Sequence, residues 1–244
     1  MTKAEIQFVR SLADKRVRDE EQLFIAEGEK LVEEIRNSTL RIRHIYTTRK
    51  DIAGDRVEYI EKKDMERISQ LKTATDCLAV VEQPQYRLDI NPKALILALD
   101  GVQNPGNLGT ILRLADWFGV EDVVCSKECA DCYNPKVIQA TMGAILRVRV
   151  HYVDNLASWL DDAKRLGMPI YGTLLDGENI YSKQLENRGV IVMGNEGRGL
   201  SDACREALTD RLYIPPYPAD APTSESLNVA MATGIILAEF RRNR

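Results

Sequence analysis

From residue 94 onward, short apolar runs alternate with helical segments, and this alternation strongly limits the possible folds. Ala94 to Leu99 is a continuous apolar run, and Val190 to Met193 is another. Such runs are typical of strands that are buried on both faces, as in a parallel sheet covered by helices. The alternation therefore predicts an α/β domain with a mainly parallel sheet. We expect strands at 94–99, 122–125, 146–152, 169–174, 190–193 and 212–214, and helices at 107–118, 135–142 and 154–166, the last capped by Asp154.

The first 85 residues are predicted to form a separate, smaller α/β unit. Its expected strands are 24–26, 42–46 and 57–60, and its expected helices are 3–12, 29–36 and 63–70. A polar, proline-flanked stretch follows at 83–92, which is typical of a linker between domains. We therefore expect a small domain at 1–85, a linker at 86–93 and a larger domain at 94–244.

Three short segments near the C-terminus combine features of a ligand site. The apolar run 190–193 opens into Gly194-Asn195-Glu196-Gly197, and a second run ends in Ile214-Pro215-Pro216. Ser226-Leu227-Asn228 then leads into a helix in which only Asn228 and Thr233 are polar from Leu227 to Ala238. A strand that ends in glycines and a carboxylate is a common ligand loop. A helix apolar on all faces is predicted to be buried, which would place Asn228 in the core with polar partners.

These segments resemble the second and third motifs of the SpoU (TrmH) family, RNA ribose 2′-O-methyltransferases of the SPOUT class. The family's first motif, an asparagine followed six residues later by arginine, is present as Asn107 and Arg113. This resemblance covers residues 94–244. A looser one covers Phe24 to Lys30, which is similar to the start of the RNA-binding domain that often precedes the catalytic domain.

The resemblance implies a fold, a cofactor and partners that composition and periodicity do not show. It implies a deep trefoil knot, a homodimer with the active site completed across the interface, and a ribosomal or transfer RNA substrate. It also implies S-adenosylmethionine as the cofactor. The expected cofactor-binding residues are Thr173, Leu174, Gly194, Asn195, Glu196, Gly197, Ile214, Pro216, Ser226, Leu227 and Asn228.

The candidate catalytic residues are Asn107, Arg113, Glu196, Ser226 and Asn228. Asn107 is expected near a helix start, where it can fix the loop. Arg113 is central in the family, but a guanidinium with a pKa above about 12 is a poor general base at neutral pH. We therefore expect Arg113 to orient a phosphate or the ribose hydroxyl. Glu196 is expected to hold either Arg113 or an amide, and Ser226 either to cap the helix or to contact substrate.

Composition sets limits on partners and compartment. The formal net charge of −4 argues against indiscriminate nucleic-acid binding, although 41–50 holds four Lys and Arg residues and no acid. No apolar stretch approaches the ~20 residues of a membrane span, and the N-terminus lacks an apolar signal core. Five unevenly spaced cysteines are typical of reduced thiols. We expect a cytoplasmic protein without a membrane partner.

Two alternatives belong to other functional classes. Cys125, Cys129 and Cys132 have the C-x3-C-x2-C spacing of enzymes that cleave S-adenosylmethionine on an iron–sulfur cluster, or of a zinc site. We expect no metal, because the strand and helix before this segment do not suit that enzyme class. A non-catalytic RNA-binding module on the same fold is the second alternative. One departure from the family pattern is the 215–225 segment, which is longer than expected and puts the lining of the cofactor site in doubt.

Overall fold

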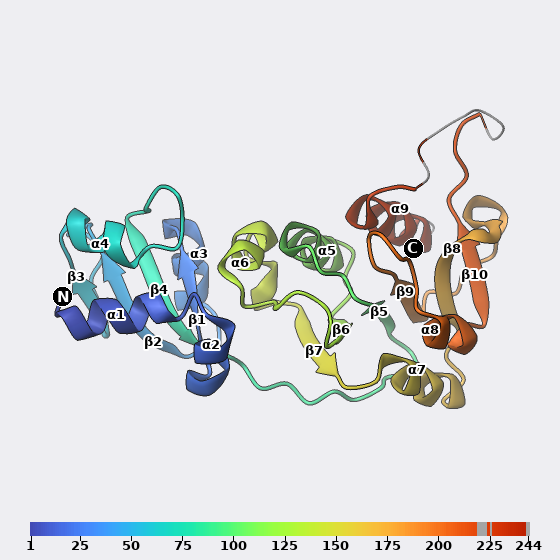
Figure 1. Ribbon diagram of the computed structural model, residues 1–244, viewed down its shortest axis with the longest axis horizontal. Helices are drawn as coiled ribbons and strands as arrows, with labels where there is room; N and C mark the ends of the chain where they lie inside the picture. The colour runs from blue at the N-terminus through green and yellow to red at the C-terminus, as the bar shows by residue number, and fades with distance from the viewer. Residues whose placement is uncertain (219–223, 225, 243–244) are drawn as a thin grey trace. The chain divides into compact units, whose positions relative to one another are not determined.

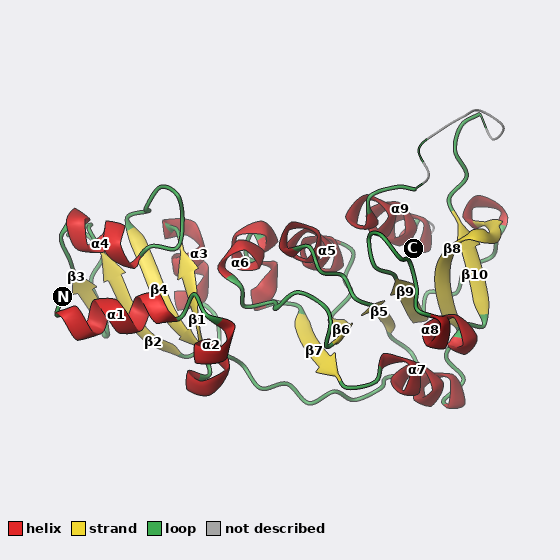
Figure 2. Ribbon diagram, in the orientation of Figure 1, coloured by secondary structure: helices red, strands yellow, loops and turns green. Residues whose placement is uncertain are grey.

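The computed structural model describes residues 1–218, 224 and 226–242, and the chain divides into two compact units. The first unit contains Met1–Gln85 and Asp131–Leu146, and the second contains Tyr86–Ala130 and Arg147–Arg244. Both units combine helices with a β-sheet (Figures 1 and 2). No helix within the described ranges is long and apolar enough to cross a membrane.

The first unit is built on a four-stranded sheet in the order β1-β4-β2-β3. Strand β4 lies between β1 and β2 and pairs antiparallel with both, whereas β2 and β3 are parallel. Helices α1 and α4 pack over one face through a buried apolar cluster that includes Val9, Met65 and Leu78. The elements are α1 (Lys3–Ser11), α2 (Lys15–Glu21), β1 (Leu23–Glu27), α3 (Glu29–Arg36), β2 (Ile42–Thr47), β3 (Val57–Tyr59), α4 (Lys62–Ile68) and β4 (Cys77–Glu82).

The segment 131–146 belongs to this unit although it is far away in sequence. It carries α6 (Pro135–Thr141) and the short 3-10 helix η1 (Ala144–Leu146). The ring of Tyr133 stacks on Phe24 of β1, with 4.9 Å between centroids. Asp131 accepts hydrogen bonds from the buried guanidinium of Arg18 on α2. Aromatic stacking and a buried ion pair therefore hold the segment on the small unit.

The second unit contains a six-stranded sheet in the order β10-β8-β9-β5-β6-β7, and every strand pair in it is parallel. This confirms the predicted α/β class with a mainly parallel sheet. The elements are β5 (Leu95–Leu99), α5 (Pro105–Trp117), β6 (Asp122–Ser126), β7 (Arg149–Val153), α7 (Leu156–Arg165), β8 (Ile170–Asn179), η2 (Ile180–Ser182), β9 (Gly189–Met193), α8 (Asp202–Ala207), β10 (Asp210–Tyr213) and α9 (Val229–Arg241).

Helices cover both faces of this sheet. Helices α7 and α8 share one buried apolar cluster with the strands, which includes Trp159, Ile170, Val192 and Cys204. Helices α5 and α9 pack against one another, and Arg241 near the end of α9 donates from Nε to the carbonyl of Phe118 just after α5. Figure 1 shows the two helix pairs on opposite sides of the strands. The sheet is therefore the middle layer of three.

Some predicted boundaries were wrong in detail. Asn155, and not Asp154, caps α7, because its side-chain oxygen accepts from the backbone N–H of Ser158 at 3.0 Å. Strand β8 is longer than expected and irregular. Arg211 of β10 pairs with Gly172, whereas the next β10 residue, Leu212, pairs with Glu178, so residues 173–177 leave the ladder.

Candidate functional site

The strand order reverses at the carboxyl ends of β5 and β9, and we expect a ligand crevice there. From β5 the chain continues to β6 on one side, whereas β9 is the neighbour of β5 on the other. In open parallel sheets, ligands bind outside the carboxyl ends at such a reversal of strand order. The loop after β5 leads into Asn104 and α5, and the loop after β9 contains Gly194 to Gly199. Two of the three sequence motifs therefore meet at this crevice.

The carboxylate of Glu196 ties these two loops together. Its Oε1 accepts from the Asn107 side-chain Nδ2 at 2.9 Å and from the Asn104 backbone N–H at 3.2 Å. Its Oε2 lies 3.4 Å from the backbone nitrogen of Gln103. Of the two roles expected for Glu196, the structure shows the one in which it holds an amide. Partial burial disfavours its charge, but the hydrogen bonds from Asn107 and the backbone outweigh this and lower the pKa of Glu196.

Asn107 uses both ends of its amide. While Nδ2 donates to Glu196, Oδ1 accepts from Asn228 Nδ2 at 3.0 Å. Asn107 lies in the first turn of α5, as predicted, and Asn228 is the residue that caps α9. One hydrogen-bonded chain, Asn228–Asn107–Glu196, therefore joins the three sequence motifs.

The prediction that Asn228 is buried in the core was wrong. Its side chain is exposed, because α9 begins only after it, at Val229. Its Oδ1 accepts from the backbone N–H of Ala230 at 3.0 Å and lies 3.3 Å from that of Met231. Asn228 therefore does have polar partners, but it finds them at a helix end. Helix α9 is also not buried all round, because Met231 is 63% exposed.

Asn104 is a functional position that was not predicted. Its side-chain oxygen accepts from the backbone N–H groups of Gly106 and Asn107, so it caps α5. Its own backbone N–H donates to Glu196. The signal was present in the sequence, because asparagine followed by Pro105 is a typical helix start.

The Gly194–Gly199 loop closes on itself. The backbone groups of Asn195 and Gly199 exchange two hydrogen bonds of 2.9 Å, and the Asn195 side chain donates to the carbonyl of Gly101 at 2.7 Å. A Cβ atom on Gly194 would lie 2.4 Å from the carbonyl carbon of Gly199. The loop's own backbone therefore requires a glycine at position 194.

Arg113 and Ser226 are exposed, and neither side chain has a hydrogen-bond or ion-pair partner among the described residues. Arg113 extends from the exposed face of α5, and no hydrogen bond or ion pair to its guanidinium is found within the described ranges. Ser226 is also exposed, and the cap of α9 is Asn228 rather than Ser226. Both side chains are therefore available to an incoming ligand.

The other expected cofactor residues lie within β8, just after β10 and just before α9. Thr173 and Leu174 lie where β8 leaves its ladder with β10, and the Thr173 hydroxyl is 3.5 Å from the Val192 carbonyl oxygen of β9. Ile214 and Pro216 follow β10, and both are half-buried. Leu227 is partly exposed before α9. Residues 219–223 and 225, in the segment that is longer than the family pattern, lie outside the described residues.

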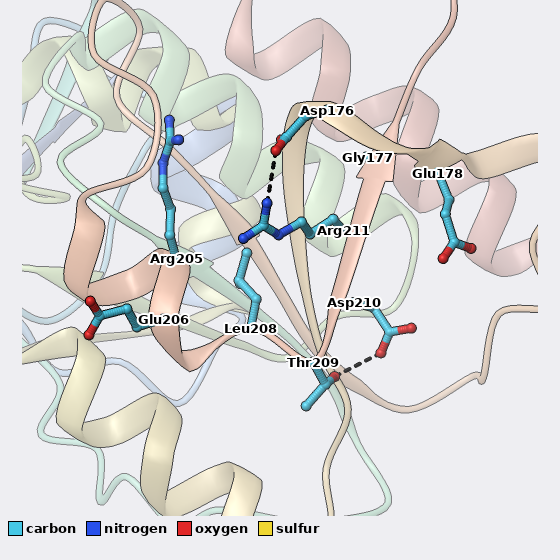
Figure 3. Close-up of a pocket in the computed structure, with 9 residues that line it drawn as sticks. All are labelled: Asp176, Gly177, Glu178, Arg205, Glu206, Leu208, Thr209, Asp210 and Arg211. Carbon is cyan, nitrogen blue, oxygen red and sulfur yellow. Dashed lines mark hydrogen bonds and ion pairs between the residues drawn. The ribbon is translucent and has the colours of Figure 1, made fainter.

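A charged pocket of about 500 Å³ lies beside the 173–177 excursion but does not coincide with the expected cofactor residues. In Figure 3 the Arg211 guanidinium points toward Asp176, and the two form an ion pair of 2.8 Å. Lys183 adds a bridge of 2.9 Å to both Glu178 and Asp210. Because its acids and bases largely pair with one another, this pocket anchors the excursion and is not the crevice of the three motifs.

The cysteines give no support to the iron–sulfur or zinc alternatives. Within the part of the chain that the structure describes, no group of three or more His, Cys, Asp or Glu side chains is placed to hold a metal. Cys129 donates from Sγ to the Leu99 carbonyl at 3.2 Å. All five cysteines are buried and free of disulfides.

Comparison with known proteins decides the family. The model of the SpoU rRNA Methylase family matches residues 94–238, and that of the MRM3-like substrate binding domain matches residues 3–86. The chain belongs to the SpoU family. It is 31% identical over 239 residues, 95% of this chain and 94% of the relative, to the 23S rRNA (guanosine(2553)-2′-O)-methyltransferase RlmP of Bacillus subtilis. It is 36% identical to the 23S rRNA (guanosine-2′-O-)-methyltransferase RlmB of Xanthomonas campestris, over 87% of this chain and 82% of the relative.

Solved structures agree with this assignment. A TrmH-family protein from Porphyromonas gingivalis superimposes with a TM-score of 0.91 at 39% identity, covering 100% of this SpoU-family chain and 99% of its own. An rRNA methyltransferase from Sinorhizobium meliloti, solved with S-adenosylmethionine bound, superimposes with a TM-score of 0.87 at 27% identity. The superposition covers 99% of this chain and 95% of the other. Both similarities extend over the small N-terminal unit as well as the larger one.

Proposed function

We propose that this SpoU-family enzyme transfers a methyl group from S-adenosylmethionine to a ribose 2′-hydroxyl of ribosomal RNA. The observation that carries the proposal is the hydrogen-bonded chain Asn228–Asn107–Glu196, which joins all three motifs at the carboxyl edge of the sheet. Both relatives described above are named as 23S rRNA guanosine 2′-O-methyltransferases, which favours ribosomal over transfer RNA.

The residues around the crevice fit the cofactor. Half-buried Leu174, Ile214 and Pro216 offer apolar contacts for a purine, and Thr173 and Ser226 offer hydroxyl groups. An apolar lining with a few convergent polar groups is typical of small-molecule sites. S-adenosylmethionine, when bound, supplies the reactive methyl group. The chain's own residues then have to bind both reactants and hold them in line.

Glu196 acts in this proposal as a positioning group rather than as a proton acceptor. Its oxygens already accept from Asn107 and from backbone N–H groups, and its lowered pKa makes it a weak base. Arg113 is an exposed cationic group without a hydrogen-bond or ion-pair partner in the described part of the chain. Its planar guanidinium suits a bidentate contact with an RNA phosphate, which would place the ribose hydroxyl.

A homodimer is part of the proposal. Trp117 on α5 is 82% exposed and Met231 on α9 is 63% exposed, although both belong to helices that pack together. Contiguous exposed apolar patches mark interaction surfaces. We assign this α5–α9 face to a second copy of the chain, with a trefoil knot in each protomer's 94–244 domain.

The 1–85 domain, joined by the 86–93 linker, binds RNA in this scheme. We also place the protein in the cytoplasm, because its five cysteines are free thiols and the cytoplasm keeps thiols reduced.

The proposal is tested by mapping ribose methylation in ribosomal RNA by mass spectrometry. A strain lacking the gene should lose one ribose methyl group, and the wild-type gene should restore it. Complementation with Asn107→Asp should not restore it. An unchanged methylation map in the deletion strain would overturn the ribosomal assignment.

A further inference from the structure

The basic run at 41–50 does not act as a single patch, because the structure separates its members. Arg49 pairs with Asp51 and Glu29, and Lys50 lies 5.6 Å from the ring centroid of Tyr59. His44 lies 3.1 Å from the carboxylate of Glu58. Within the described ranges, the side chains of Arg41 and Arg43 have no hydrogen-bond or ion-pair partner. The free positive charge of the run therefore lies at the start of β2.

Arg41 lines a pocket of about 310 Å³ in the first unit, together with Thr39, Leu40 and residues 82–85. This volume is at the small end of the range of about 300–1,000 Å³ found for ligand pockets. It suits one nucleotide rather than a helix. Leu40 and Pro84 supply apolar surface, and Arg41 supplies the only positive charge among the described residues of the lining.

The walls of this pocket are fixed by hydrogen bonds. The backbone N–H of Glu82 donates to the Arg41 carbonyl at 2.9 Å, and that of Gln83 donates to the Gln22 carbonyl at 2.8 Å. The Gln83 side chain donates from Nε2 to the carbonyls of Arg18 and Leu23, both at 3.1 Å. Recognition by such a wall costs little ordering entropy on binding.

The remaining polar atoms of the lining are mostly acceptors. Gln83 Nε2 donates to two carbonyls, and Gln85 Nε2 donates one of its two N–H groups to Gln22 Oε1 at 2.6 Å. No donor to their side-chain oxygens, or to the Glu82 carboxylate, is found in the described part of the chain. Acceptors select a base that offers N–H donors, and guanine offers its N2 amino group and N1–H on one edge.

We propose that this pocket binds one unpaired guanine nucleotide of the RNA substrate, with its phosphate on Arg41 and its Watson–Crick edge on Glu82 and the glutamine oxygens. The site is distinct from the three-motif crevice, and it rests on the proposed function only in taking RNA as the ligand. Sequence-specific RNA recognition usually targets such unstacked bases in loops.

The test uses the full-length protein and two labelled single-stranded RNA probes, ten uridines long or the same with one central guanosine, by fluorescence anisotropy. The wild type should prefer the guanosine probe by about 10-fold, since one base-edge contact is worth ~1–3 kcal/mol. Glu82→Gln, which keeps only one acceptor oxygen, should reduce the preference. Arg41→Ala should weaken both probes and reduce the slope of log Kd against log salt concentration by about 0.7, the loss of one phosphate contact.

Arg10→Ala is the matched control, because Arg10 is an exposed arginine of the same unit that does not line the pocket. An Arg41→Ala variant that behaves like Arg10→Ala, or a guanosine preference that is undiminished in Glu82→Gln, would overturn the assignment. Methyl transfer to ribosomal RNA by the wild type is measured separately. If methylation is present and the pocket variants bind like wild type, only this inference fails, whereas absent methylation refutes the proposed function.

Discussion

Asn107 and Asn228 lie 121 positions apart in sequence, yet their side-chain amides form a 3.0 Å hydrogen bond between the first turn of α5 and the cap of α9. Because Asn107 also donates to Glu196, its amide orientation is determined at both ends. The carboxylate oxygens are pure acceptors, so Nδ2 must face Glu196 and Oδ1 must face Asn228. The site therefore depends on an amide at position 107, not merely on a polar side chain.

Replacing Asn107 with aspartate tests this dependence. A carboxylate there cannot donate to Glu196 and places a second negative charge beside it. We expect Asn107→Asp to lower the free energy of unfolding by about 1–3 kcal/mol, since polar groups lose their partner. Methyl transfer should fall by about 100-fold, because the loops move relative to each other. Urea unfolding and single-turnover assays measure the two effects.

Asn155→Asp is the control for this substitution. Asn155 caps α7 through its side-chain oxygen, and aspartate caps helices equally well. Its stability and activity should match the wild type. An Asn107→Asp variant that is equally silent would show that the amide at 107 is not needed.

The ionisation of Glu196 gives a prediction for pH. Its pKa is lowered in the folded protein, so its charge stabilises the fold above the ordinary glutamate pKa. This contribution is lost as pH falls through the lowered folded-state pKa. Wild type should therefore exceed Glu196→Gln in unfolding free energy at neutral pH, and the difference should shrink between about pH 5 and pH 3. A difference that stays constant over this range in urea titrations would refute the coupling.

The sheet of the second unit was predictable because its strands are fully buried. Runs such as Leu95–Leu99 and Gly189–Met193 are apolar without alternation, as parallel strands between two helix layers must be. Helix α2 was not predicted, because its seven residues include only one apolar side chain, Val17. Strand β4 was missed although its run Leu78–Val81 is apolar. Its burial between β1 and β2 explains that composition.

Long-range relationships could not be predicted from spacing. The resemblance indicated that Asn107, Glu196 and Asn228 share a site, but not that Asn107 bridges the other two. The excursion at 173–177 has no sequence signal, because it depends on where β10 pairs with β8. The same is true of Asp131, whose partner Arg18 lies 113 positions away.

That buried ion pair predicts a large effect on stability. The Arg18 side chain is 1% exposed and that of Asp131 is 11% exposed. Asp131→Ala leaves a buried guanidinium without its counter-charge, which typically costs about 3–5 kcal/mol. We expect the free energy of unfolding, measured by urea titration, to fall by that amount. Asp162→Ala removes an exposed partner of Arg165 and should change stability by less than about 0.5 kcal/mol. Equal effects of the two variants would contradict the burial argument.

The α5–α9 face gives a prediction about assembly. Trp117→Glu places a charge on the proposed interface and should shift the protein from dimer to monomer in sedimentation velocity. Leu166→Glu is the control, because Leu166 is an exposed apolar residue that follows α7. It should leave the dimer intact. A wild type that sediments as a monomer at micromolar concentration would refute the interface itself.

The last prediction concerns Arg113, which is exposed on α5 and has no partner in the described part of the chain. If it only stabilised the helix, Arg113→Lys would be nearly silent, because both residues are good helix formers with the same charge. A lysine cannot reproduce a planar, bidentate contact. We therefore expect normal folding, near-native S-adenosylmethionine affinity by calorimetry, and a kcat lowered by about 100-fold at saturating RNA, comparable to the loss of one preorganised transition-state contact.

The parameter that changes distinguishes the possible roles of Arg113. Loss of a contact that strengthens as the 2′-oxygen attacks lowers kcat, whereas loss of a contact of equal strength throughout raises only KM for RNA. Arg165→Lys, on the exposed face of α7, is the matched control and should leave both constants unchanged. A raised KM with native kcat would make Arg113 a binding residue. Glu196 is already held by Asn107 and by backbone donors. A lowered kcat in Arg113→Lys would therefore assign the orientation of the ribose hydroxyl to the Arg113 guanidinium.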